Sequence, residues 1–351
     1  MNIGIVCPNW IGDVVMATPT LRALRRHYGP EAKIHGIMKP YVSQVLAGTN
    51  WLDELVYFDP RQRNPELGWR PVIKKLRRLK LDAMIVLTNS LRGGAIAWLS
   101  GARQRIGYAG NLRGPLLNRR FKRPRNGAAL GPVSAVDHYL GLAYAVGCPP
   151  ESPKLALATL PEDERAADRI WDALGLSTAN KVVLLNTGGA FGSARHWPTD
   201  YFVALAGRIV EETDASVLVI CGPGEREAAA CIERRADHGR VKSMADQDMS
   251  LGVAKACVRR GQLMVTTDSG PRHFAAAFDV PAVTLFGPTD PRSTANYHGA
   301  EITLMRQLRC MPCGQRSCPL DHHRCMRELT ADDVYRAVAQ QLQQANSSRA
   351  A

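Results

Sequence analysis

The sequence lacks the marks of several large protein classes. No apolar run approaches the roughly 18 residues of a membrane-spanning helix, and the chain opens on a short apolar run, residues 2–6, that is typical of a strand and not of a charged leader. We therefore expect an untargeted cytoplasmic protein. A complete Gly-x-Gly-x-x-Gly and a Walker loop are absent, which argues against a dehydrogenase and a P-loop nucleotidase. The Gly-x-Ser-x-Gly elbow is also missing, which argues against a hydrolase with Ser269 as nucleophile and His273 as base.

Excess positive charge is absent from the second half of the chain. Residues 151–351 carry 23 Lys and Arg against 24 Asp and Glu, whereas residues 1–150 carry 22 against 8. The basic clusters of the first half are Lys74, Lys75, Arg77, Arg78 and Lys80, and then Arg113, Arg119, Arg120, Lys122, Arg123 and Arg125. Such a face is either only solvated or attracts an anionic membrane, a phosphorylated glycolipid or nucleic acid. Few aromatic residues and no recognition motif accompany the charges, which argues against nucleic acid.

The hydrophobic pattern indicates the fold. Short apolar runs alternate with longer amphipathic stretches, which predicts an α/β protein of two Rossmann-like, doubly wound domains. The strands are expected at residues 3–7, 33–38, 55–58, 83–87, 105–108, 182–186, 216–221, 263–267 and 282–286. Three prolines in residues 148–153 predict an extended linker. We therefore place an N-terminal domain at 1–150 and a C-terminal domain at 151–330. Residues 331–351 hold a final helix, expected over 331–343 and capped by Thr330, and a frayed tail. Two such domains facing a cleft form the GT-B architecture of glycosyltransferases, although unrelated proteins share this outline.

Gly12 and Asp13 follow the first apolar run. Ligands of open α/β sheets bind beyond the carboxyl ends of the strands, and glycine lets the backbone approach a ligand closely. Because Pro19 suits the first turn of a helix, we expect the helix to begin after Thr18 and Asp13 to lie in the preceding loop. Asp13 then either caps that helix or faces the ligand.

Two loops of the second domain carry candidate phosphate-binding groups. Residues 186–198 combine three glycines, which allow close approach, with Arg195, whose charged fork suits phosphate oxygens. Residues 266–273 pass from a strand into a helix, where the backbone N–H groups of Ser269 and Gly270 would bind a pyrophosphate. Thr187, Gly188 and His273 are further candidates in these loops, and Asp268 is either another candidate or a helix cap.

A third loop, residues 221–225, contains Glu225. This carboxylate either accepts hydrogen bonds from ribose hydroxyls or is an acid favoured by the dipole of the following helix. Asp246-Gln247-Asp248 has the letters of a metal-binding Asp-x-Asp, but an acid-rich helix N-terminus explains it without a metal.

The nine cysteines fall into two groups. Five in apolar or helical contexts, Cys7, Cys148, Cys221, Cys231 and Cys257, are expected to be reduced thiols packed as small hydrophobes. Four late cysteines, Cys310, Cys313, Cys318 and Cys325, either wrap one zinc ion or are free or redox-active thiols. Their spacing matches no standard zinc ribbon, and in either case we expect the segment to staple a loop.

In their order and spacing, these segments resemble the ADP-heptose:lipopolysaccharide heptosyltransferases, most closely those of the heptosyltransferase II type. The resemblance covers nearly the whole chain and is carried by Trp10-Ile-Gly-Asp13-Val with Pro19, Arg195-His-Trp-Pro198, Thr267-Asp-Ser-Gly270 with His273, Phe286-Gly-Pro-Thr-Asp290 and the late cysteine segment. It implies a GT-B enzyme that moves heptose from ADP-heptose to the lipopolysaccharide inner core, with inversion and without a metal or other cofactor. The alternatives are a sugar-nucleotide epimerase of similar fold and a basic nucleic-acid-binding protein.

The resemblance also implies roles for individual residues and partners. Asp13 matches the family's general base, and Arg195 stands where many members have Lys, beside the diphosphate. Ser269 and Gly270 match the backbone phosphate site, Glu225 the ribose contact, and Met249 lies near the expected adenine pocket. The remaining candidate substrate-binding residues are Gly12, Thr187, Gly188, Asp268 and His273. The implied acceptor is an anionic glycolipid at the cytoplasmic face of the inner membrane, which suits the basic first half and a peripheral protein.

Overall fold

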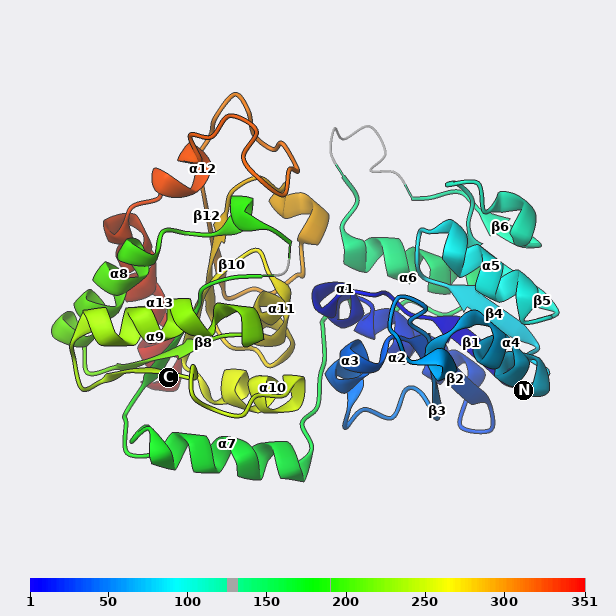
Figure 1. Cartoon of the computed structure of the whole chain (residues 1–351), viewed down its shortest axis with the longest axis horizontal. Helices are drawn as coiled ribbons and strands as arrows, with labels where there is room; N and C mark the ends of the chain where they lie inside the picture. Colours follow the sequence, from blue (N-terminus) through cyan, green and yellow to red (C-terminus); the bar gives the residue numbers. More distant parts are fainter. Residues whose placement is uncertain (125–131, 190, 351) are drawn as a thin grey trace. The chain divides into compact units, whose positions relative to one another are not determined.

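The computed structural model describes residues 1–124, 132–189 and 191–350, and the chain divides into two compact units (Figure 1). Unit 1 comprises Met1–Ala158 and Arg292–Asn296, and unit 2 comprises Thr159–Pro291 and Tyr297–Ala351. Arg125 of the second basic cluster lies outside the described residues, as does Ala190 within the loop 186–198.

Unit 1 is built on a parallel sheet in which the described residues form six strands, in the order β3-β2-β1-β4-β5-β6. The strands are β1 (Asn2–Val6), β2 (Lys33–Met38), β3 (Glu54–Tyr57), β4 (Ala83–Val86), β5 (Gln104–Tyr108) and β6 (Arg119–Phe121). The helices are α1 (Ile11–Met16), α2 (Thr18–Tyr28), α3 (Pro40–Ser43), α4 (Trp69–Arg78), α5 (Leu91–Leu99) and α6 (Ala135–Val146), with short 3₁₀ turns at Gln44–Leu46, Pro65–Leu67 and Gly114–Leu116.

Unit 2 has a second parallel sheet, whose described strands follow the order β12-β11-β10-β7-β8-β9. They are β7 (Val182–Asn186), β8 (Ser216–Ile220), β9 (Val241–Ser243), β10 (Leu263–Thr267), β11 (Ala282–Phe286) and β12 (Glu301–Met305). The helices are α7 (Pro161–Ala173), α8 (Thr199–Glu212), α9 (Arg226–Ala236), α10 (Leu251–Arg260), α11 (Gly270–Ala277), α12 (Arg324–Arg327) and α13 (Ala331–Ala350). The 3₁₀ turns are η4 (Ser193–Arg195), η5 (Pro223–Glu225) and η6 (Pro291–Thr294).

Both sheets have the same topology. Counted from the first strand of each unit, the spatial order is 3-2-1-4-5-6, the doubly wound order of dinucleotide-binding folds. The order reverses between β1 and β4 in unit 1 and between β7 and β10 in unit 2. Ligands bind at this switch point, outside the carboxyl ends of the strands. The prediction of two doubly wound α/β sheets is confirmed.

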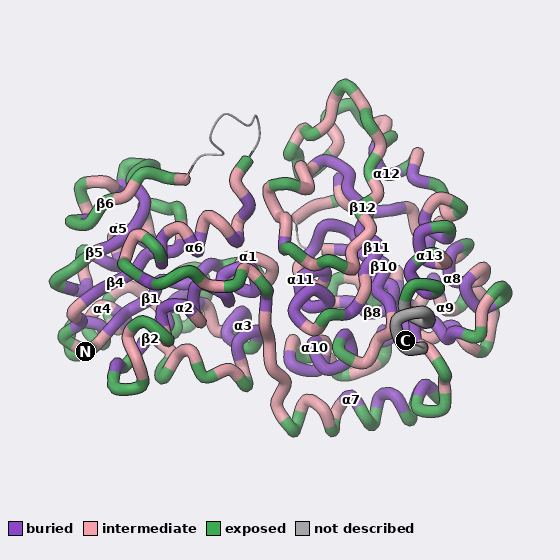
Figure 2. The backbone as a smooth tube through the Cα atoms, turned by 180° about the vertical axis from the view of Figure 1, so that it is seen from behind, coloured by how far each residue is buried: buried purple, intermediate pink, exposed green. Residues whose placement is uncertain are grey.

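The strands nearest the switch points are buried on both faces. Residues of β4, β7, β8, β10 and β11 are buried throughout (Figure 2). In unit 1, Val6 of β1 packs in one apolar cluster with Leu76 of α4 and Ile96 of α5. Because side chains alternate along a strand, Ile3 and Ile5 point to the opposite face, and both are fully buried. Two covered faces explain why these strands are apolar throughout.

The structure corrects one helix boundary that matters for function. Asp13 does not lie in a loop, because a short helix, α1, already begins at Ile11 and places Asp13 in its first turn. The residue before it, Trp10, is extended and forms the N-cap, and α2 follows after Ala17. A carboxylate in the first turn of a helix is stabilised by the helix dipole. Asp13 therefore suits a helix that begins before Pro19, whereas our prediction placed the helix start after Thr18.

The C-terminal helix also differs from its predicted extent. Thr330 caps α13 as predicted, since its Oγ1 accepts a hydrogen bond from the Asp333 N–H at 3.2 Å. The Asp333 carboxylate in turn accepts from the Thr330 N–H at 3.2 Å, which completes a capping box. The helix then continues to Ala350, beyond the end expected at Gln343. In the described part of the chain, no helix is both long and apolar enough to cross a membrane.

Candidate active site

In unit 1, Asp13 lies just beyond the carboxyl end of β1 and is held by a tyrosine. The Tyr139 hydroxyl, from α6, donates a hydrogen bond to Asp13 Oδ1 at 3.0 Å. Burial, followed by the charge of Asp13 and this hydrogen bond, raises the pKa of Tyr139 well above its usual value. The hydroxyl therefore stays protonated and remains a donor at neutral pH. Asp13 itself and Gly12, in the same helical turn, are half-buried.

A polar cluster that the sequence reasoning missed lies at the carboxyl ends of β4 and β5. Arg113 is fully buried and donates to the Tyr108 carbonyl and to Asn89 Oδ1, both at 2.7 Å. The Asn89 amide lies 2.9 Å from His138 Nε2. Burial, with the charges of Arg123 and Arg113, lowers the pKa of His138 to about 4, so its ring is neutral at pH 7. In the sequence, this cluster is indicated only by the polar residues 88–90, which directly follow the apolar run 83–87.

One residue of the second basic cluster, Arg113, does not lie on the surface that the sequence predicts. Arg113 does not belong to a solvated face, because its guanidinium lies inside unit 1 on carbonyl and amide oxygens. Burial, together with the charge of Arg123, lowers the pKa of Arg113 to about 10, which leaves it charged at neutral pH. Arg119, Arg120, Lys122 and Arg123 are exposed, as a solvated or ligand-binding face requires.

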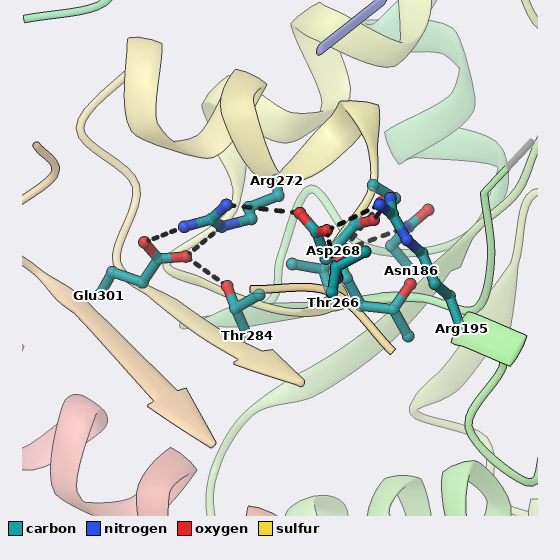
Figure 3. Close-up of polar contacts among 10 residues, drawn as sticks. Asn186, Arg195, Thr266, Asp268, Arg272, Thr284 and Glu301 are labelled. Carbon is teal, nitrogen blue, oxygen red and sulfur yellow. Dashed lines mark hydrogen bonds and ion pairs between the residues drawn. The ribbon is translucent and has the colours of Figure 1, made fainter. Parts of the chain in front are cut away.

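In unit 2, Arg195 and Asp268 meet at the switch point of the second sheet (Figure 3). Arg195 Nη2 lies 3.0 Å from Asp268 Oδ2, and its Nη1 donates to the backbone carbonyl of Asp268. The guanidinium stacks on the ring of Phe191, 3.9 Å from the ring centroid. Ion pair, carbonyl and ring together fix the guanidinium, and 15% of the side chain remains exposed.

Asp268 continues into a second arginine–carboxylate pair (Figure 3). Its Oδ1 lies 3.5 Å from Arg272 Nη1, and its Oδ2 accepts a hydrogen bond from Thr289 Oγ1 at 2.8 Å. Arg272 binds Glu301 through two hydrogen bonds of 2.6 and 2.9 Å. Burial alone would raise the pKa of Glu301, but the hydrogen bonds and charge of Arg272, with the Thr284 hydroxyl, bring it below the usual value. Glu301 therefore stays ionised at neutral pH on the buried Arg272 guanidinium.

Ser269, and not Asp268, forms the N-cap of α11, with Gly270 as the first helical residue. The Ser269 side chain makes no capping hydrogen bond; its Oγ accepts from Asn186 Nδ2 at 2.8 Å and lies 3.2 Å from Thr266 Oγ1. His273 is buried, and burial and the charges of Arg272 and Arg195 lower its pKa well below the usual value. Its Nδ1 has no hydrogen-bond partner among the described residues. No Ser–His pair of the kind a hydrolase needs is therefore formed there.

The structure brings Thr187, Gly188 and Glu225 together beside this site. A Cβ atom at Gly188 would lie 2.5 Å from Glu225 Oε1, so only glycine allows this approach. Glu225 Oε2 accepts a hydrogen bond from the Gly222 N–H at 2.7 Å. Thr187 is buried, and its hydroxyl has no hydrogen-bond partner within the described ranges. Met249 is half-buried in the segment before α10, and no hydrogen bond or ring contact described for the chain joins it to this group.

The late cysteine segment packs on the loop that carries Arg195. The Arg316 carbonyl accepts a hydrogen bond from the Ala194 N–H at 3.0 Å, and His323 Nε2 lies 2.9 Å from the Ala194 carbonyl oxygen. Gly192 has φ of +149°, and a Cβ atom there would collide with the Arg316 carbonyl oxygen. The segment therefore staples this loop, as expected, and positions Arg195.

All nine cysteines are free thiols. Four of the scattered ones are buried as predicted, whereas Cys231 is only half-buried. Burial, then the neighbouring thiols of Cys313, Cys318 and Cys310, raises the pKa of Cys325 to about 11. Within the described ranges, no group of three or more His, Cys, Asp or Glu side chains is arranged to hold a metal ion.

Comparison with known proteins identifies the family to which the chain belongs. The model of glycosyltransferase family 9 (heptosyltransferase) matches residues 69–324. Lipooligosaccharide heptosyltransferase 2 of Campylobacter jejuni is 25% identical, with 95% of this chain and 96% of the relative covered. Lipopolysaccharide heptosyltransferase 2 of Escherichia coli K12 is 27% identical over 84% of this chain and 85% of the relative.

The solved structures agree with this match. The structure of E. coli ADP-heptose lps heptosyltransferase II superposes with a TM-score of 0.78 and covers 98% of this chain and 99% of that one, at 23% identity. This likeness confirms the predicted GT-B fold. Since the family model spans most of the chain, the chain belongs to glycosyltransferase family 9, the heptosyltransferases.

Proposed function

We propose that this protein transfers heptose from ADP-heptose to the inner core of lipopolysaccharide, with inversion at the anomeric carbon. Membership of the family supports heptosyl transfer over epimerisation. The names of the relatives support the two substrates, since the solved E. coli protein is an ADP-heptose enzyme and both curated relatives act on lipopolysaccharide or lipooligosaccharide.

The donor diphosphate binds at the switch point of unit 2. Arg195 supplies a fixed guanidinium, and the N-terminus of α11 at Ser269 and Gly270 supplies N–H groups with a partial positive charge. The buried hydroxyl of Thr187, unpartnered among the described residues, is available to a phosphate oxygen. As the bond between the anomeric carbon and the diphosphate breaks, these donors stabilise the negative charge that develops on the leaving ADP.

The nucleoside of the donor extends toward Glu225 and Met249. One oxygen of Glu225 is bound to the Gly222 N–H, and the other, which faces Gly188, accepts a hydrogen bond from a ribose hydroxyl. Met249 packs against the adenine, a role that suits a flexible, polarisable side chain.

Asp13 is the general base on the acceptor side. It takes the proton of the acceptor hydroxyl as that oxygen attacks the anomeric carbon on the face opposite the diphosphate, which inverts the configuration. The hydrogen bond from Tyr139 keeps the carboxylate oriented. The acceptor is a phosphorylated, anionic glycolipid held in an anionic membrane, and the basic charge of residues 1–150 attracts the protein to that membrane, at the cytoplasmic surface of the inner membrane.

The observation that carries the proposal is the fixed Arg195 guanidinium beside the N-terminus of α11. The test is incubation of the protein with ADP-heptose and a panel of truncated core acceptors, with product mass and ADP release as readouts. We expect one acceptor to gain a single heptose as ADP is released. Formation of an epimer in the acceptor-free control, or no product with any acceptor, would contradict the proposal.

A further inference from the structure

A groove with an apolar floor and a cationic rim lies between α4 and α5 in unit 1. Its volume is about 580 Å³, and its floor is formed by Trp69, Ile73 and Leu99. Its rim carries four cations of α4, namely Arg70, Lys74, Arg77 and Arg78. Leu76 of α4 and Ile96 of α5 belong to one apolar cluster, so the two helices pack over the same part of unit 1.

The charge of the rim is not compensated by the protein. All four rim cations are exposed, and α4 has no acidic residue. Within the described ranges, none of the four forms an ion pair with a carboxylate. Arg77 Nε donates to the Leu99 carbonyl at 2.9 Å, which joins α4 to the end of α5 and fixes the shape of the groove. The rim therefore offers a concentrated positive charge to an anionic partner.

The outer face of α5 is apolar where a solvated helix would be polar. Leu91 and Trp98 are 49% and 55% exposed. They lie seven residues apart, which places them on the same side of the helix. Large exposed apolar side chains next to cations are typical of surfaces that rest in the headgroup region of a membrane, where Trp is enriched.

We infer that the α4–α5 surface, formed by this groove with Leu91 and Trp98, is where the protein binds an anionic phospholipid bilayer. The inference rests on the membrane contact included in the proposed function and assigns it to named residues. The cations bind the lipid phosphates, and Trp98 and Leu91 insert among the headgroups. A soluble sugar phosphate would use the cations but not the exposed apolar side chains, which is why the lipid surface is the better fit.

The test measures co-sedimentation of the whole protein with phosphatidylcholine vesicles, with and without added phosphatidylglycerol. The paired substitution Lys74→Ala with Arg78→Ala removes two rim charges and should weaken binding to the anionic vesicles roughly thirtyfold. Adding Trp98→Ser to this double variant should weaken its binding to the anionic vesicles further. The matched control is Arg119→Ala with Arg120→Ala, two exposed cations of the other basic cluster, which should bind nearly as the parent does.

A parallel assay of heptose transfer to a water-soluble truncated acceptor separates the outcomes. If the surface binds lipid, the α4 variant transfers to this acceptor at the parent rate, which also shows that it is folded. Equal binding to neutral and anionic vesicles, or equal loss in the control variant, would overturn the inference. So would unchanged vesicle binding with a raised KM for the acceptor, because the cations would then bind the acceptor. Failure of the proposed transfer leaves the vesicle result intact, since that assay needs no donor.

Discussion

The switch points of the two sheets have the same topology and opposite chemistry. In unit 1 the loop after the first strand leads into α1 and presents the Asp13 carboxylate, held by Tyr139. In unit 2 the equivalent loop leads to Arg195, and the neighbouring strand leads into the N-terminus of α11. The first sheet thus presents the proposed base, and the second presents the proposed anion site.

The comparison shows that a carboxylate's surroundings decide its role. Asp13 is half-buried and accepts a hydrogen bond from the neutral Tyr139 hydroxyl, which suits the general base that we propose. Asp268 is buried between Arg195 and Arg272, and both of its oxygens are engaged, so it serves to hold the arginines. The fold supplies the position, and the chemistry comes from the side chains placed there.

Asp13→Asn tests the base and should have the largest effect. The amide keeps the shape but cannot take the proton, so kcat should fall by roughly 10² to 10⁴. The ADP site in unit 2 is unchanged, so ADP affinity should be retained. Steady-state kinetics of heptose transfer give the first value, and an unchanged kcat would remove Asp13 from the mechanism.

Arg195→Ala tests the anion site and should lower kcat by on the order of 10² to 10³, because the leaving diphosphate loses a fixed donor. The substitution also leaves Asp268 with one arginine fewer, so Arg195→Lys is the matched control. Lys restores a charge at this position, and most of the activity should return with it. Equal loss in both variants would mean that the bidentate shape of arginine, and not its charge, is what matters.

Glu301→Gln tests the claim that unit 2 uses buried carboxylates for structure. Breaking this buried pair should lower the free energy of unfolding by roughly 3 to 5 kcal/mol at neutral pH. The pKa of Glu301 is lowered in the folded protein, so its contribution is present above the ordinary carboxyl pKa and is lost as the pH falls through the folded value. Urea unfolding at pH 7 and near pH 3 should show the difference shrink with acid, and a constant difference would contradict this.

Tyr139→Phe should have the smallest effect. It removes the hydrogen bond to Asp13 without opening a cavity. A carboxylate that loses a donor holds its proton more tightly, so the acidic limb of the kcat/KM profile should move to higher pH. A role in packing alone would lower stability and leave the position of that limb unchanged.

Much of the fold is predictable because buried parallel strands are apolar on both faces. The runs that became β1, β4, β7, β8, β10 and β11 stand out for this reason. The sequence does not predict β6, β9 and β12, which lie at the edges of the sheets. β6 and β9 have only three residues each, and β12 has no buried residue. Edge strands tolerate polar residues, so their pattern is weak.

The site was only partly predictable. Ser269 and Gly270 come just after the run that forms β10, and Arg195 lies in the glycine-rich loop after β7. The structure groups them as their sequence positions suggest. The partners of these residues come from distant segments: Tyr139 is 126 residues from Asp13, and Arg316 lies far along the chain from Ala194. Only the tertiary fold pairs them, so no local pattern could reveal the Tyr139 hydrogen bond or the burial of Arg113.

The most direct test of the division between the units is calorimetric titration of ADP into the parent protein, Asp13→Asn and Arg195→Ala under identical conditions. If one sheet supplies the base and the other binds the nucleotide, the Kd of Asp13→Asn equals that of the parent, and that of Arg195→Ala is raised. A Kd raised by the Asp13 substitution and left unchanged by the Arg195 substitution would contradict the account.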